Sequence, residues 1–401
     1  MDRRTHSRLN RRPALAAVAS VFMFAAVAPA QPPAGFDPSA WSASELVRLE
    51  IRGGEPESFA GRPVAMQRDL GGLFQSEEGR LKVIYWQDLR AAEATGEPFM
   101  PLTADELSAA LQAATPGTQT LATDHYVVLY RGQEAYAQWI VRMYERLYKG
   151  FYSYWGKKLG VELAEPKFPM VVNVFATRQG FLDHAKIDSL EGAEAMIGYY
   201  HLHTNQTVSY DLTESQTLAP PGRSVSQGHL LKAILAQPQA ERTVATIVHE
   251  AVHQLAYNSG LQVRLADNPL WLSEGIAMFF ESPDLSMSQG WNGIGKVNQY
   301  QLAVFRNLPP SEGDWVTELI RDDAMFQNPA SVNAAYARSW ALTYYLLKAQ
   351  PKQFAAYMRE IGGELPLQPT DSQRRLEMFR RHFGDDFVAL QRDVARLIGR
   401  L

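Results

Sequence analysis

The segment TIVHEAVHQLAYNSG, residues 246–260, places two histidines four residues apart, with a glutamate directly after the first. Apolar residues recur around them with helical spacing, at Val244, Ile247, Val248, Ala251, Val252 and Leu255. Gly260 follows where a helix of this length would end. Because residues four apart share one helix face, His249 and His253 can direct two imidazoles at one cation. Glu250 then projects to the side, where it can take a proton from a water on that cation. The spacing predicts a helix with a metal site on it.

A buried core helix with its histidines bonded to backbone is the competing interpretation of this motif. With nine histidines in 401 residues, a chance match is expected in roughly 1% of such chains. A second segment, NPLWLSEGIAMFFE (268–281), favours the metal site. It predicts a mostly apolar helix in which Glu274 would be a costly unpaired charge unless it faced a cation. The helix dipole alone would explain the place of Glu274 near a helix start, but not its combination with the two histidines.

The strings HEAVH and WLSEGIA together resemble the gluzincin metallopeptidases, the clan of thermolysin and the zinc aminopeptidases. Residues 120 to 395 also resemble a bacterial family of exported, largely uncharacterised gluzincin-like proteins. That similarity rests on GYY (198–200), YARSWALTYYLL (336–347) and HFGDDFVALQRDV (382–394). The resemblance implies that His249, His253 and Glu274 bind zinc and that Glu250 is the general base.

Two departures limit what the resemblance carries over. The thermolysin branch has an aspartate four residues after the glutamate ligand, and here that position is Met278. Support for a histidine ligand must then come from elsewhere, with Asp267 and Glu281 as the candidates. The string EGAEAMIGYY (191–200) does not reproduce the segment with which zinc aminopeptidases hold a free amino terminus. Exopeptidase activity is therefore unsupported.

Two further features bear on catalysis and substrate. Tyr336 begins a predicted helix. Related zinc peptidases carry a tyrosine in a similar place that stabilises the oxyanion, so Tyr336 is the predicted second catalytic residue. A place in the hydrophobic core would also explain this tyrosine.

IGYYHLH (197–203) is the predicted edge strand to which a peptide substrate adds itself. Its His201 and His203 would face one side, and two surface histidines are a better explanation than a second metal site.

The first thirty residues have the pattern of a secretory signal peptide. Five arginines precede or border the run PALAAVASVFMFAAVAPA (13–30), which ends in small residues of the A-x-A type. The run is shorter than the roughly 20 residues that span a bilayer comfortably, which disfavours a membrane anchor. We therefore expect an exported protein, periplasmic or extracellular, with no stable membrane insertion after signal cleavage.

The remaining chain predicts an α+β fold. Residues 31–120 contain short strand-like runs between glycines and predict a β-rich N-terminal module. Residues 121–400 predict the gluzincin-like metallopeptidase domain. Its first part, 121–228, is a small mixed sheet with helices, and its second, 229–400, is mainly helical and carries the zinc helix.

Charge and cysteine content narrow the function. Residues 1–30 carry five arginines and one aspartate, a net charge of +4, so their removal changes the formal charge from −4 to −8. This argues against nucleic acid as a partner. The chain has no cysteine, so a metal site must use His, Asp and Glu.

The sequence therefore predicts an exported Zn²⁺-dependent metallopeptidase acting on a peptide or protein substrate. A zinc-binding hydrolase of another amide, a catalytically silent scaffold that binds peptides or cell-wall material, and a helical protein with an accidental motif are the alternatives.

Overall fold

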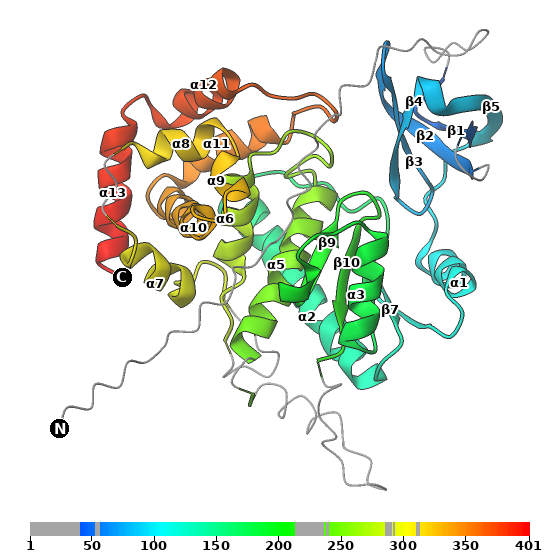
Figure 1. The fold of residues 1–401 in the computed structure, drawn as a ribbon, viewed down its shortest axis with the longest axis horizontal. Helices are drawn as coiled ribbons and strands as arrows, with labels where there is room; N and C mark the ends of the chain where they lie inside the picture. Colours follow the sequence, from blue (N-terminus) through cyan, green and yellow to red (C-terminus); the bar gives the residue numbers. More distant parts are fainter. Residues whose placement is uncertain are drawn as a thin grey trace, which may run out of the picture.

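The structure, a computed structural model, describes residues 41–52, 57–212, 236–237, 240–284, 291, 293–309 and 313–401. The predicted signal peptide (1–30) lies outside these residues, and so does the string APPGRSVSQG (219–228), whose composition predicts a loop. The fold is α+β, as expected: two five-stranded sheets are followed by a mainly helical region (Figure 1).

The first sheet is antiparallel and has the order β4-β3-β2-β1-β5. Its strands are β1 (Glu45–Ile51), β2 (Glu57–Gln67), β3 (Gly71–Gln75), β4 (Leu81–Tyr85) and β5 (Leu89–Pro98), with a 3₁₀ turn, η2 (Trp86–Asp88), before the last. Alternate residues of β1 point into a small core of its own, formed by Val47, Leu49, Ile51, Phe74, Ile84, Trp86 and Leu89. We call residues 41–98 the N-terminal module.

The second sheet has the order β6-β7-β8-β10-β9. Its strands are β6 (Gln119–Ala122), β7 (Tyr126–Tyr130), β8 (Met170–Phe175), β9 (Gly198–His201) and β10 (Gln206–Tyr210). The three inner strands are parallel, while β6 and β9 are antiparallel edges. β6 spans the predicted division at residue 120 and belongs to this sheet. The hairpin of β9 and β10 turns at Asn205, whose φ of 60° is the left-handed conformation that asparagine tolerates.

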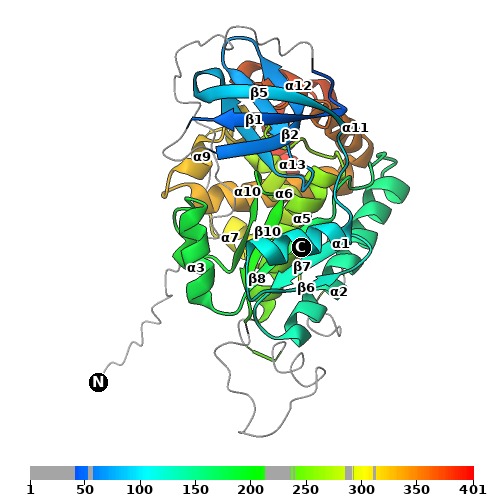
Figure 2. The same cartoon turned by 90° about the vertical axis from the view of Figure 1, so that its right-hand side faces the viewer.

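Helices cover both faces of the second sheet. α2 (Glu134–Tyr152), which continues into a π-helical turn (η3, Ser153–Lys158), and α5 (Ala240–Asn258) pack on one face. α1 (Ala104–Ala114) and α3 (Arg178–Ile187) pack on the other, and a 3₁₀ turn, η4 (Ala193–Ala195), precedes β9. Figure 1 shows α3 on the side of β9 and β10 away from α5, and Figure 2 views the second sheet from the side that α1 and α3 cover.

The helical region shares one hydrophobic core with α2, α5 and the face of the second sheet that these two helices cover. It consists of α6 (Leu270–Phe280), α7 (Gln299–Arg306), α8 (Trp315–Arg321), α9 (Ala324–Gln327), α10 (Val332–Ala349), α11 (Pro351–Ile361), α12 (Ser372–Phe383) and α13 (Phe387–Gly399). α5 lies between the second sheet and these helices (Figure 1), so it is buried on nearly every side. None of the helices in the described part of the chain combines the length and apolar character needed to cross a membrane.

Candidate metal centre

The helix α5 carries both histidines of the motif as predicted, and Gly260 follows its end with a φ of 75°. The centroids of the His249 and His253 rings lie 4.8 Å apart. Each side chain is 1–2% exposed. The four-residue spacing thus brings the two imidazoles together inside the protein, not on its surface.

The helix α6 adds the third group. Oε2 of Glu274 lies 3.1 Å from Nε2 of His249, and Oε1 lies 3.5 Å from Nε2 of His253. One ligand atom from each of the three residues falls within 4.8 Å of the others. Among the described residues, this is the one group of three or more metal-ligating side chains that could hold an ion.

Several buried polar atoms at this site make no hydrogen bond within the described part of the chain. They are Nε2 of His253, Oε1 of Glu274 and Oε1 of Glu250. A buried polar atom without a partner costs about 1–3 kcal/mol, so three together are unusual. A cation between the first two atoms would satisfy both. The donor set therefore fits a metal ion.

Protonation differs between the two histidines. Burial lowers the pKa of His249, but hydrogen bonds to Glu274 and Glu281 outweigh burial and raise it well above its ordinary value. Burial and the nearby His249 hold the pKa of His253 well below its ordinary value. His253 is therefore neutral, the form in which imidazole binds a metal, and a bound cation would take the place of the Nε2 proton of His249.

Glu281 is the residue that supports His249. Its Oε2 lies 2.5 Å from Nδ1 of His249, and its Oε1 accepts a hydrogen bond of 2.6 Å from Nδ2 of Asn298. Glu281 ends α6, seven residues after Glu274, so it lies on the same helix face as the ligand. Of the two candidates predicted from the sequence, Glu281 makes the contact. Asp267 instead binds Arg375 and the Thr370 amide.

Glu250 is held by the backbone of the edge strand. Its Oε2 accepts a hydrogen bond of 2.8 Å from the Tyr200 amide in β9, which leaves Oε1 for a reacting molecule. Burial raises the pKa of Glu250 to about 8, although the neighbouring His249 opposes this rise. Positive charge at the site would favour the ionised form.

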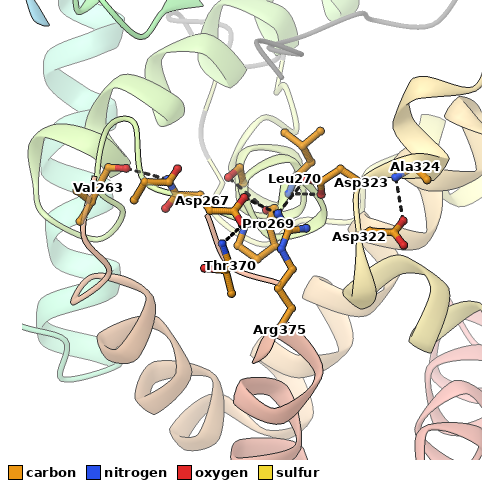
Figure 3. Close-up of polar contacts among 12 residues, drawn as sticks. Val263, Asp267, Pro269, Leu270, Asp322, Asp323, Ala324, Thr370 and Arg375 are labelled. Carbon is orange, nitrogen blue, oxygen red and sulfur yellow. Dashed lines mark hydrogen bonds and ion pairs between the residues drawn. The ribbon is translucent and has the colours of Figure 1, made fainter. Parts of the chain in front are cut away.

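A half-buried ion-pair cluster fixes the start of α6. Arg375, from α12, binds Asp267 at 2.6 Å and Asp323 at 3.0 Å (Figure 3). The second oxygen of Asp323 accepts from the Leu270 amide at 3.0 Å. Leu270 is the first residue of α6, so this cluster fixes the start of the helix that carries Glu274. Nothing local in the sequence marks Arg375, because it is one arginine among several in an amphipathic helix.

Gly275, the residue after Glu274, lets α10 approach α6 closely. A Cβ atom there would lie 2.1 Å from Oγ1 of Thr343 and 2.9 Å from the carbonyl oxygen of Ser339. Tyr336 lies one turn earlier in α10, buried, with its ring edge-on to Phe326 at 5.4 Å. Its predicted catalytic role stays a prediction.

His201 and His203 lie at the end of β9 and in the turn after it, with ring centroids 5.9 Å apart. Both are half-buried, not surface side chains. Nδ1 of His201 pairs with Oγ1 of Thr204, and Nδ1 of His203 with the carbonyl oxygen of Leu81. Within the described residues they belong to no metal-ligating group of three.

Residues 243–368 match the profile of a family described as "Protein of unknown function (DUF1570)". This segment includes the whole candidate metal centre and Tyr336 but a minority of the 401 residues. No curated protein matches the chain.

Proposed function

We propose that this protein is a zinc-dependent hydrolase of the gluzincin type that cleaves peptide bonds. The observation that carries the proposal is the convergence of His249, His253 and Glu274 beside a carboxylate, Glu250, that has one oxygen free. Three protein ligands that leave a position open are the arrangement of catalytic zinc sites, whereas structural sites are closed by four.

The ligand types favour zinc among the biological cations. Two imidazoles with one carboxylate suit zinc and other late transition metals, while magnesium and calcium prefer sites made of oxygen atoms. His249, His253 and Glu274 would hold the ion. A bound zinc ion supplies a Lewis acid that acidifies water and polarises a carbonyl group.

The surrounding residues then have defined tasks. Glu281 accepts the Nδ1 proton of His249, which would fix the tautomer and leave Nε2 free to bind the ion. The Tyr200 amide holds Oε2 of Glu250 in place, so Oε1 is directed at the attacking water. Glu250 takes a proton from this water as it adds to the scissile carbonyl, and delivers a proton to the departing amine. Tyr336 is the proposed donor to the oxyanion.

The charge of the chain and its first thirty residues bear on the substrate and on where the protein acts. The net negative charge of the chain after residue 30 supports a peptide or protein substrate over nucleic acid. The arginine-rich, then apolar, residues 1–30 support export to the periplasm or the extracellular space.

The test is metal analysis and peptide-library digestion of the purified protein, with and without a chelator. We expect one zinc per chain and cleavage that the chelator abolishes. Glu250→Gln should keep the zinc and lose nearly all turnover, while His253→Ala should lose the zinc. Zinc without cleavage would favour a different amide substrate or a binding scaffold. Full activity of Glu250→Gln would show that the general base is another residue.

A further inference from the structure

The N-terminal module contacts the strand that holds Glu250. The Leu81 amide, at the start of β4, donates a hydrogen bond of 2.7 Å to the carbonyl oxygen of His203, just after β9. Nε2 of Gln67 in β2 donates to the carbonyl oxygen of Leu367 at 2.6 Å. Figure 1 places the module beside one end of the second sheet. The module is therefore joined by hydrogen bonds to the part of the chain that carries the metal centre.

One buried arginine ties three segments together at this contact. Arg264 lies in the connection between α5 and α6 and is 9% exposed. Its Nη2 donates to the carbonyl oxygen of Gly79 at 2.8 Å, and its Nη1 to that of Leu202 at 3.2 Å. Gly79 belongs to the module, and Leu202 follows β9 directly. Arg264 thus holds the end of β9 and the β3–β4 turn of the module to the segment that links the two metal-binding helices.

Apolar side chains seal the same contact. Leucines of the module pack in one cluster with side chains from the β9 turn and from two loops of the helical region: Leu73, Leu81, Tyr200, Leu202, Leu265 and Leu367. The Tyr200 ring also stacks on that of Tyr257 in α5 at 5.7 Å. Arg264, Leu265 and Leu367 fall inside the family match over 243–368, whereas every module residue in the contact falls outside it.

The contact leads directly to the proposed general base. Tyr200 packs in the cluster through its ring, and its amide donates to Oε2 of Glu250. In the described part of the chain, β9 is an edge strand with a sheet neighbour, β10, on one side only. The module and Arg264 hold the chain just past the end of this strand, at the carbonyl groups of His203 and Leu202.

We propose that the N-terminal module is a positioning element of the catalytic unit, acting through Arg264 on β9, and is not a detachable inhibitory segment. The inference rests on the proposed function, because it concerns the placement of Glu250. Arg264 is a positioning residue: it acts through Tyr200 and leaves the metal ligands, which come from α5 and α6, unchanged.

The test uses the full chain with Arg264→Lys, which keeps the positive charge but loses the two-pronged contact. Arg359→Lys is the matched control, because Nη2 of Arg359 likewise donates to a glycine carbonyl, Gly160, at 2.8 Å, but on the surface. Leu81→Ala removes a module side chain from the apolar cluster. If Arg264→Lys does not fold, this variant tests on its own whether the module holds β9. Hydrogen exchange of the Tyr200 amide, zinc affinity, kcat and KM are measured for each variant.

We expect Arg264→Lys to speed exchange of the Tyr200 amide by about tenfold or more, since the amide loses its fixed partner. Its kcat should fall by about 10–100-fold, the loss expected for a catalytic group misplaced by about 1 Å. Zinc affinity and KM should stay near those of the wild type and of Arg359→Lys. Leu81→Ala should change exchange and kcat in the same direction.

Wild-type exchange at Tyr200 with wild-type kcat in both folded variants would overturn the inference. So would a proportional loss of zinc affinity, which would indicate general unfolding of the site. A wild-type protein that cleaves no peptide would defeat the proposed function instead. The exchange measurement would then still decide whether the module holds β9.

Discussion

Replacing Gly275 by alanine tests whether the close packing of α6 and α10 places the metal ligand Glu274. The new Cβ would lie 2.1 Å from Oγ1 of Thr343 and 2.9 Å from the carbonyl oxygen of Ser339. Rotation of Thr343 can relieve the first overlap, but the second involves backbone, so α6 must move away from α10. Overpacking of this kind costs about 1–3 kcal/mol. Alanine returns up to about 1 kcal/mol of helix propensity. With that full offset, the net loss should reach about 2 kcal/mol in the free energy of unfolding, and zinc binding should weaken about tenfold as Glu274 shifts.

Denaturant unfolding of the zinc-stripped protein and zinc titration against a competing chelator measure the two effects separately. Gly399→Ala is the control, because this glycine lies at the end of α13 with no atom within 4 Å of the new Cβ. It should leave both quantities unchanged or raise stability slightly. Adding Thr343→Ala to Gly275→Ala should recover part of the loss, since the Ser339 overlap remains. Wild-type stability and zinc affinity in Gly275→Ala would refute the packing argument.

Three other substitutions probe the support around the site. Glu281→Ala should weaken zinc binding by about 10–100-fold, because His249 loses the carboxylate that orients it. The control in the same titration is Glu360→Ala, which removes a similar contact to His382, far along the chain. Arg375→Ala should lower the free energy of unfolding by about 3 kcal/mol, the low end for a broken buried ion pair, because water reaches both aspartates; an equal change for the exposed Arg381→Ala would contradict this. Tyr336→Phe should lower kcat by about 10²–10³-fold with unchanged zinc content. An unchanged kcat would show that Tyr336 only packs in the core.

Much of the fold was predictable because it depends on short-range spacing. Helical periodicity located α5 and α6, and the string IGYYHLH (197–203) located the strand β9. The four-residue spacing alone puts the two histidines side by side on α5, and the packing of α6 against α5 brings Glu274 to them. The sequence named Glu281 only as one of two candidates, beside Asp267, and the structure selects it because it lies on the ligand's face of α6.

The contacts that the sequence did not predict join distant segments or use backbone atoms. The Tyr200 amide that holds Glu250 carries no side-chain signature, and neither does the Gly79 carbonyl that Arg264 binds. Asn298 has the pattern of a helix cap, which it fulfils by accepting from the Gln301 amide, but nothing local indicates that its amide group also reaches Glu281. Such contacts depend on how α5, α6 and the two sheets pack, so only the three-dimensional structure reveals them.

The most direct measurement is anomalous diffraction at the zinc absorption edge from crystals of the zinc-loaded protein. We predict one peak at about 2.0–2.2 Å from Nε2 of His249, Nε2 of His253 and a carboxylate oxygen of Glu274. No peak between these three side chains, or a peak that lacks Glu274 as a ligand, would contradict the account.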